Sequence, residues 1–228
     1  MNYNQKDKQA RKFNHMIFGL FESYFFKQAE KYFKGKLIDI GCGNMPYYDA
    51  LRPLIDEHVG VDHELSIHDK SKFDLVGTAY SIPSDDNYFD SALCTAVLEH
   101  LEEPELAIRE CHRVLKPGGI AIYSVPFIWH IHEEPRDFYR YSNYGLEYLF
   151  TKAGFEIIEI KPLSGFMVTF LQLHLYYLKG KLNRGLIRKS GAFDAYVYLI
   201  NRFGLWLNKF DTSYRWTWMY VVTAKAIK

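Results

Sequence analysis

A glycine-containing loop follows a short apolar run in the first quarter of the chain. Residues 37–41 read LIDIG, and Gly43 follows closely after Gly41. Glycines directly after a strand let the backbone turn tightly and come close to a ligand. The carboxylate of Asp39, just before them, can accept hydrogen bonds from an ammonium or a hydroxyl group. This spacing predicts a binding loop for a small polar molecule.

A second acid, Asp62, ends the next apolar run, VGVD at 59–62. An acid at this place can bind both ribose hydroxyls of a nucleoside. A dinucleotide-binding loop would also need a small residue at position 46, but this chain has Pro46 there. The negative charge of an acid before the first glycine would also repel a pyrophosphate. S-adenosylmethionine has no phosphate and carries an ammonium and a sulfonium, so it fits these residues better. The other alternative is that these glycines only allow the backbone to turn and bind no ligand.

Polar side chains are concentrated at 130–142, which read HIHEEPRDFYRYS. A histidine or a carboxylate in such a loop can remove the proton of an acceptor hydroxyl during group transfer. We expect His132 and Asp137 to act in this way, together with His100, which follows an earlier apolar run. The alternative for His100 is a structural role, in which His100 and Glu99 form a hydrogen-bonded pair at the start of the next loop.

Two other interpretations of this polar loop stay open. Asp137 and Arg140 can form an ion pair that fixes the shape of the loop. His130, His132 and Glu133 can bind zinc. The spacing places no fourth ligand beside these three, so we expect no metal.

Apolar runs alternate with helical patterns along the chain. The predicted strands are 37–41, 59–62, 72–76, 88–94, 120–125, 155–160 and 218–227, and the predicted helices are 5–33, 46–54, 103–115, 143–152, 165–179 and 193–209. Such alternation predicts an α/β fold with a doubly wound, mostly parallel sheet. Ligands of these sheets bind outside the carboxyl ends of the strands, where the motifs above lie. We expect one domain over 1–228, with a helical lead-in at 1–35 and a helical insertion at about 162–216.

Three motifs, in order, resemble one known family. LIDIGCGN resembles motif I of class I S-adenosylmethionine-dependent methyltransferases, and GVD at 60–62 resembles the acidic loop after it. Residues 88–119 are similar to the fourth strand, helix and turn of the methyltransferase type 11 group. The resemblance covers about residues 36–161. It implies an enzyme with S-adenosylmethionine as cofactor and a Rossmann-like, seven-stranded sheet whose last strand is antiparallel.

The resemblance also implies roles for single residues. Thr78 departs from the acid that the family usually has beside the adenine, and Met45 departs from the third glycine of many relatives. The implied cofactor-binding residues are Asp39, Gly41, Gly43, Asp62, His63, Thr78, Ala79 and Thr95.

The polar loop carries a further resemblance. Residues 135–142 resemble the P-x-D-F-x-R-[YFW]-[ST] loop of methyltransferases associated with surface-glycan or lipid-linked sugar pathways. The implied function is methyl transfer to a small-molecule or lipid-linked glycan acceptor, at oxygen or nitrogen. The alternative is a non-catalytic protein that binds S-adenosylmethionine and uses its basic, aromatic C-terminal region as an interaction surface.

Charge is distributed unevenly between the two parts of the chain. Residues 161–228 contain eleven Lys or Arg and two acids, although the whole chain carries only +1. Apolar helices beside clustered basic residues, as at 165–210, can lie on an anionic membrane surface, and they can equally form a lid or a homodimer face. The acidic remainder of the chain makes a nucleic-acid partner less favourable.

Three cysteines, Cys42, Cys94 and Cys111, lie far apart in the sequence and form no CxxC pair. The polar N-terminal residues contain no apolar stretch typical of a secretory leader. We therefore expect buried free thiols and a cytoplasmic protein, with membrane association left open.

Overall fold

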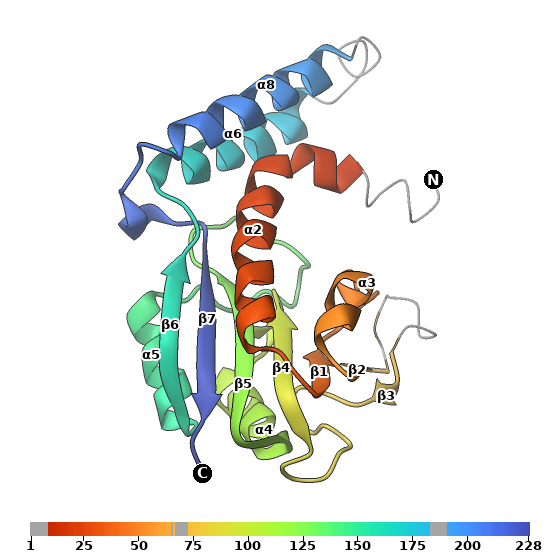
Figure 1. Cartoon of the computed structure of the whole chain (residues 1–228). Coiled ribbons are helices and arrows are strands. Elements are labelled where there is room, and N and C mark those ends of the chain that lie inside the picture. Colours follow the sequence, from red (N-terminus) through yellow and green to blue (C-terminus); the bar gives the residue numbers. More distant parts are fainter. Residues whose placement is uncertain (1–8, 65, 67–72, 183–190) are drawn as a thin grey trace. The chain divides into compact units, whose positions relative to one another are not determined.

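The computed structural model describes residues 9–64, 66, 73–182 and 191–228 (Figure 1). These residues divide into two compact units. The sheet unit consists of residues 25–127, 131–161 and 220–228, and the helical unit consists of residues up to 24, 128–130 and 162–219. The single domain expected over 1–228 stays a prediction, and part of the basic run 179–189 lies outside the described residues.

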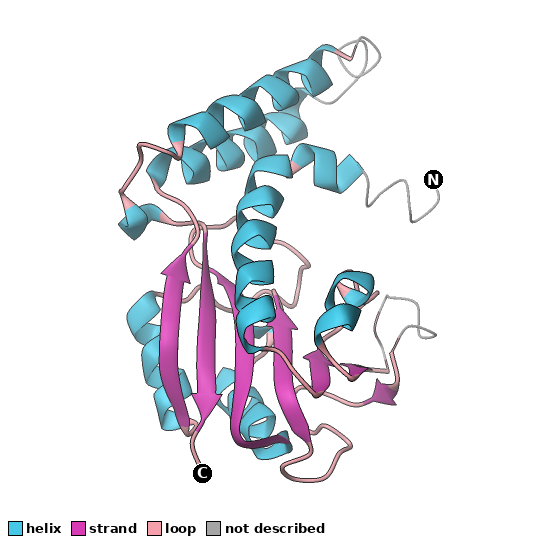
Figure 2. Ribbon diagram, viewed as in Figure 1, coloured by secondary structure: helices cyan, strands magenta, loops and turns pink. Residues whose placement is uncertain are grey.

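The sheet contains seven strands in the order β3-β2-β1-β4-β5-β7-β6 (Figure 2). β1 pairs in parallel with β2 and β4, and β4 pairs in parallel with β5. β7 runs opposite to its neighbours (Figure 1). The predicted doubly wound sheet with an antiparallel last strand is therefore confirmed. The strands are β1 (Lys36–Ile40), β2 (Glu57–Asp62), β3 (Leu75–Val76), β4 (Phe89–Thr95), β5 (Leu115–Pro126), β6 (Phe155–Pro162) and β7 (Met219–Ala226).

Helices cover both faces of this sheet (Figure 2). α4 (Pro104–Val114) and α5 (Asn143–Lys152) lie on one face, whereas α3 (Tyr48–Leu51) and residues 25–32 of α2 (His15–Tyr32) lie on the other. α4 shows why the sequence forms such a helix, because its apolar side chains recur on one face and are buried there. These side chains are Ala107, Ile108, Cys111 and Val114.

The fifth strand is longer than predicted. β5 begins at Leu115, whereas the predicted strand begins at residue 120, so the strand also includes the KPGG segment. The pairing of β4 with β5 shifts register between Phe89 and Ser91, and Gly118 has a φ of +77°. A bulge with a glycine in the left-handed region lets the chain pass from helix to strand without a separate loop.

The helical unit is built around α6 (Phe166–Leu182) and α8 (Ala192–Leu207). Phe193 and Val197 of α8 are buried against Leu175 of α6 and Phe13. The buried amide of Asn201 accepts from the Met16 N–H at 2.7 Å and donates to the carbonyls of Phe13 and Val197. These bonds satisfy the polar group inside the apolar packing.

The three cysteines are buried and unpaired, as predicted. Within the described residues, no helix has the length and apolar character needed to cross a membrane.

Candidate active site

The glycine loop begins where β1 ends. Gly41 has a φ of +67° and donates its N–H to the carbonyl of Val61 at 2.9 Å. A Cβ atom on Gly41 would lie 2.6 Å from the side chain of Val97. Only glycine adopts this conformation at this distance without strain. Gly43 also has a positive φ, and so does Met45, at +49°.

Asp62, at the end of β2, fixes this loop. Its carboxylate is buried and accepts the Gly43 N–H at 3.1 Å, the His63 N–H at 2.7 Å and the Ser66 hydroxyl at 3.0 Å. The loop and the strand-end acid therefore meet at one edge of the sheet, as the sequence predicts. His63 is exposed beside this acid.

Asp39 has different surroundings from those expected. Its carboxylate is buried, and one oxygen lies 3.2 Å from Nε2 of His58 on β2. Burial raises the pKa of Asp39, and the neighbouring His58 opposes this shift. Contact of Asp39 with a ligand stays a prediction, and the structure shows a second function for it in the β1–β2 pair. The sequence analysis gave His58 no role.

The other predicted cofactor residues follow neighbouring strands. Thr78 and Ser81 form a short antiparallel bridge around Ala79, after β3. Thr95 is the last residue of β4, and Ala96 next to it has a φ of +52°. The Ala96 N–H donates to the backbone carbonyl of Ser124 at 3.0 Å, which ties the end of β4 to β5.

The polar loop is attached to the end of β4 by backbone contacts. The Glu99 carbonyl accepts the N–H groups of Phe138 at 2.9 Å and Tyr139 at 3.2 Å. The buried Tyr141 donates its hydroxyl to the Leu98 carbonyl at 3.0 Å. These bonds hold the loop over the η3 turn, Leu98–His100.

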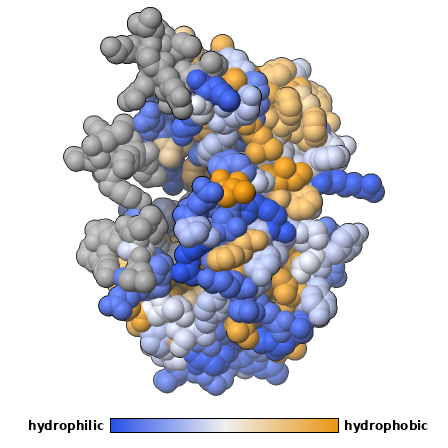
Figure 3. All heavy atoms as spheres, turned by 180° about the vertical axis from the view of Figure 1, so that it is seen from behind, coloured by the Kyte–Doolittle hydropathy of each residue, from blue (hydrophilic) through white to orange (hydrophobic). Residues whose placement is uncertain are grey.

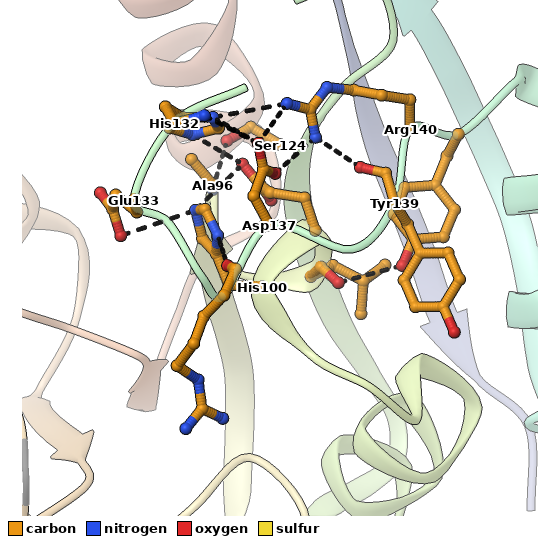
Figure 4. Close-up of polar contacts among 12 residues, drawn as sticks. Ala96, His100, Ser124, His132, Glu133, Asp137, Tyr139 and Arg140 are labelled. Atoms are coloured by element: carbon orange, nitrogen blue, oxygen red, sulfur yellow. Dashed lines mark hydrogen bonds and ion pairs between the residues drawn. The ribbon is translucent and has the colours of Figure 1, made fainter. Parts of the chain in front are cut away.

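Asp137 lies between an arginine and a histidine (Figure 4). Its two oxygens accept from the guanidinium of Arg140 at 2.6 and 2.7 Å. Oδ2 also accepts the backbone N–H of His132 at 2.8 Å and lies 3.3 Å from Nδ1 of its ring. The Arg140 guanidinium holds the pKa of Asp137 well below its usual range. The ion pair considered in the sequence analysis is therefore present, and Asp137 is a charged neighbour of His132.

His100 and His132 approach each other edge to face, with ring centroids 4.8 Å apart. Nδ1 of His100 lies within hydrogen-bond distance of the Arg136 carbonyl, so this nitrogen donates and Nε2 is the basic nitrogen of the neutral ring. Burial lowers the pKa of His132, whereas the charge of Asp137 raises it. The net shift of the His132 pKa is downward, which favours the neutral ring that a base needs.

Glu99 is the most unusual group in this cluster. Its carboxyl is buried, and neither oxygen accepts a hydrogen bond from the described residues. Oε1 lies 3.8 Å from Nε2 of His100 and 4.0 Å from Nε2 of His132. Burial raises the pKa of Glu99 to about 8. At neutral pH the cluster therefore contains a protonated carboxyl beside two imidazoles.

Known proteins resemble the part of the chain that contains the glycine loop. A family model described as "Methyltransferase domain" matches residues 38–123. The chain is 26% identical over 125 residues to a ubiquinone biosynthesis O-methyltransferase of Alkalilimnicola ehrlichii, covering 50% of this chain and 48% of that protein. It is 24% identical to a demethylmenaquinone methyltransferase of Staphylococcus carnosus, covering 66% and 78%.

A solved S-adenosylmethionine-dependent methyltransferase of Thermotoga maritima, described as a possible histamine N-methyltransferase, is 26% identical, with a TM-score of 0.53 and coverage of 70% of this chain and 79% of that one. These comparisons support a class I S-adenosylmethionine-dependent methyltransferase fold and cofactor for the chain, and the family match itself lies within residues 38–123. The chain spans about half the length of the ubiquinone biosynthesis O-methyltransferases that it matches.

The residues of the glycine loop fit S-adenosylmethionine, the cofactor that the methyltransferase domain match implies. The glycine loop has backbone conformations that bring main-chain groups close to a ligand, and the buried carboxylate of Asp62 lies beside it. S-adenosylmethionine supplies a methyl group already activated on sulfonium. Gly41, Gly43 and Asp62 would hold it, with Ala79 and Thr95 at the neighbouring strand ends.

The polar cluster includes two residues outside the predicted site, Glu99 and Arg140. Both were noted only as members of structural pairs in the sequence analysis. The sequence gives little indication that Glu99 and Arg140 belong to this cluster, because neither is close in sequence to both His100 and His132. The ligand atoms of Glu99, His100 and His132 lie within 4.8 Å of one another, a grouping that can hold a metal ion. This group differs from the His130, His132 and Glu133 set considered above.

Proposed function

We propose that this methyltransferase transfers a methyl group to a hydroxyl oxygen of a small acceptor molecule, and that His132 removes the hydroxyl proton. The contact of His132 with Asp137 carries this proposal. A carboxylate beside Nδ1 favours the tautomer whose Nε2 accepts a proton, and it stabilises the imidazolium that forms.

Each residue of the cluster has a defined part in this reaction. Asp137 is a positioning residue, because Arg140 occupies both of its oxygens. His100 lies beside His132 and has a basic Nε2, so it is the second candidate to contact the acceptor. The glycine loop and Asp62 align the donor, and alignment of two reactants can contribute about 7–11 kcal/mol to the lowering of the barrier.

Oxygen is favoured over nitrogen as the methylated atom. An amine can attack without losing a proton first, whereas a hydroxyl benefits from a base in the transition state. The relative from Alkalilimnicola ehrlichii is named an O-methyltransferase, which supports the same choice. A lipid-linked glycan as the acceptor and a homodimer stay predictions.

The experiment has two stages. Calorimetric titration with S-adenosylmethionine and S-adenosylhomocysteine, with NAD as control, tests the cofactor. Release of S-adenosylhomocysteine is then measured with matched aromatic acceptors that carry either a hydroxyl or an amine. We expect turnover with the hydroxyl acceptor and loss of that turnover in His132→Ala.

Other outcomes would contradict the proposal. Turnover with the amine that is unchanged in His132→Ala would indicate transfer to nitrogen without this base. Tight cofactor binding without turnover on any tested acceptor class would favour the non-catalytic binding protein.

A further inference from the structure

A row of aromatic residues runs along the solvent side of α6. Phe166, Phe170, His174 and Tyr177 recur every three or four positions, so they share one helix face. The rings of Phe166 and Phe170 stack with centroids 5.7 Å apart, and Phe170 stacks on His174 at 6.3 Å. Phe170 is 50% exposed and Tyr177 is 66% exposed. This row therefore packs against itself and leaves large apolar surfaces in water.

A second row lies on α8 and continues past its end. Tyr196, Leu199, Phe203, Trp206 and Phe210 are spaced by three or four residues. All five are exposed, from 36% at Tyr196 to 70% at Phe210. The buried side chains of α8 occupy another side of the helix, so the core of the helical unit does not use this row. They are Phe193, Val197 and Asn201.

The two rows form one surface, which we call the aromatic face. His174 Nε2 and the Tyr196 hydroxyl are 2.8 Å apart, which joins α6 to α8 across the face. Trp216, which is exposed after α8, packs on Phe166 at 5.9 Å. Figure 3 shows hydrophobic residues gathered on the part of the surface formed by the helical pair. Contiguous exposed apolar surface of this kind marks an interaction site.

The charges around this face are mainly positive. Within the described part of residues 166–216, the basic residues are Lys179, Lys181, Arg202, Lys209 and Arg215, and the only acids are Asp194 and Asp211. Asp211 is occupied within the unit, because it accepts the Met167 N–H at 2.7 Å and the Ser213 N–H at 3.0 Å. Exposed cations adjoin the aromatic rows within the described residues. They are Lys181, Arg202, Lys209 and Arg215.

We propose that the aromatic face binds an anionic membrane surface, with α6 and α8 lying in the plane of the lipid headgroups. Phenylalanine and leucine side chains would enter the acyl boundary, and tryptophan and tyrosine favour the headgroup level, where one end of the ring is apolar and the other is polar. The surrounding cations would bind anionic headgroups. A self-complementary dimer through the same face would instead bring the cations of two copies together.

Vesicle sedimentation of the full-length protein tests this inference without cofactor or acceptor, so its result does not depend on the proposed reaction. We expect binding to phosphatidylcholine vesicles that contain phosphatidylglycerol, weak binding to phosphatidylcholine alone, and release at high salt. Lys209→Glu with Arg215→Glu should weaken binding roughly tenfold or more. Phe203→Ser with Trp206→Ser should also weaken it, because these side chains supply apolar contact.

Tyr144→Ser is the matched control, since it removes an exposed ring of the sheet unit, and it should bind vesicles like the wild type. Thermal unfolding checks that each variant is folded. Equal binding by the wild type and both face variants would overturn the inference. A dimer in light scattering that Phe203→Ser dissociates, with no vesicle binding, would also overturn it and assign the face to a second copy of the chain.

Discussion

Nδ1 of His132 lies 3.3 Å from Oδ2 of Asp137, and the same oxygen accepts a hydrogen bond from Arg140 at 2.7 Å. The arginine keeps the carboxylate ionised, and the carboxylate in turn favours protonation of the imidazole. Burial lowers the pKa of His132, and the Asp137 carboxylate opposes that shift, so both affect how readily His132 gains a proton.

We expect Asp137→Asn to lower kcat by about 10²–10⁴-fold, because the imidazolium formed during proton removal loses its charged partner. The variant should also move the acid limb of the pH–rate profile to lower pH. Asp137 raises the pKa of His132, so its neutralisation lowers that pKa further. Steady-state kinetics across pH measures both effects. Asp85→Asn, at an exposed acid, is the control and should change neither.

His132→Ala should lower turnover by about 10²–10⁴-fold while the affinity for S-adenosylhomocysteine stays within error of the wild type. His132 and the glycine loop lie on different segments of the chain, so loss of the base should leave cofactor binding unchanged. His15→Ala replaces an exposed histidine and should retain activity. Full activity of His132→Ala and Asp137→Ala on the true acceptor would contradict the assignment of the base.

Asp62→Ala should weaken binding of S-adenosylhomocysteine by roughly 10²-fold or more, because each hydrogen bond to a charged group contributes about 1.5–3 kcal/mol. The variant also loses the carboxylate that accepts the hydrogen bond from the Gly43 N–H. Calorimetric titration gives the affinity, with Asp49→Ala on α3 as control. Unchanged affinity in Asp62→Ala would mean that the ribose is bound elsewhere.

Glu99→Gln should be stabilising relative to the wild type at alkaline pH. The pKa of Glu99 is about 8 in the folded state and near 4.5 when unfolded, so its contribution to stability is complete below about pH 4.5 and is lost as the pH rises through 8. Glutamine carries no charge and lacks this dependence. Urea unfolding at about pH 5 and about pH 9 should show a gain for the variant that grows with pH. A constant difference would indicate that Glu99 is not buried as a neutral acid.

Gly41→Ala should destabilise the sheet unit by about 1–3 kcal/mol, because φ is positive and the new Cβ would meet Val97. The double variant Gly41→Ala with Val97→Ala separates the two causes, with Val97→Ala alone as the reference. Removal of the valine side chain relieves the contact and leaves the backbone strain. We therefore expect Gly41→Ala to cost less in the Val97→Ala background than in the wild type, as measured by urea unfolding.

The sequence determined the features that depend on neighbouring residues. Alternating apolar runs and helical patterns predicted the parallel sheet, and the glycines after β1 predicted the loop at its end. Asp62 could be placed because an acid that ends a parallel strand must lie at the same sheet edge as the loop. These features follow from local conformation and from the rule that carboxyl ends of parallel strands meet.

The tertiary structure alone decided the contacts between distant residues. Asp39 meets His58 because the β1–β2 register puts both side chains on one face of the sheet, and no local pattern specifies that register. Glu99 and His132 are far apart in the sequence, and backbone bonds from the polar loop to the end of β4 bring them together. The raised pKa of Glu99 follows from its burial, which depends on packing of the whole unit rather than on the residues beside it.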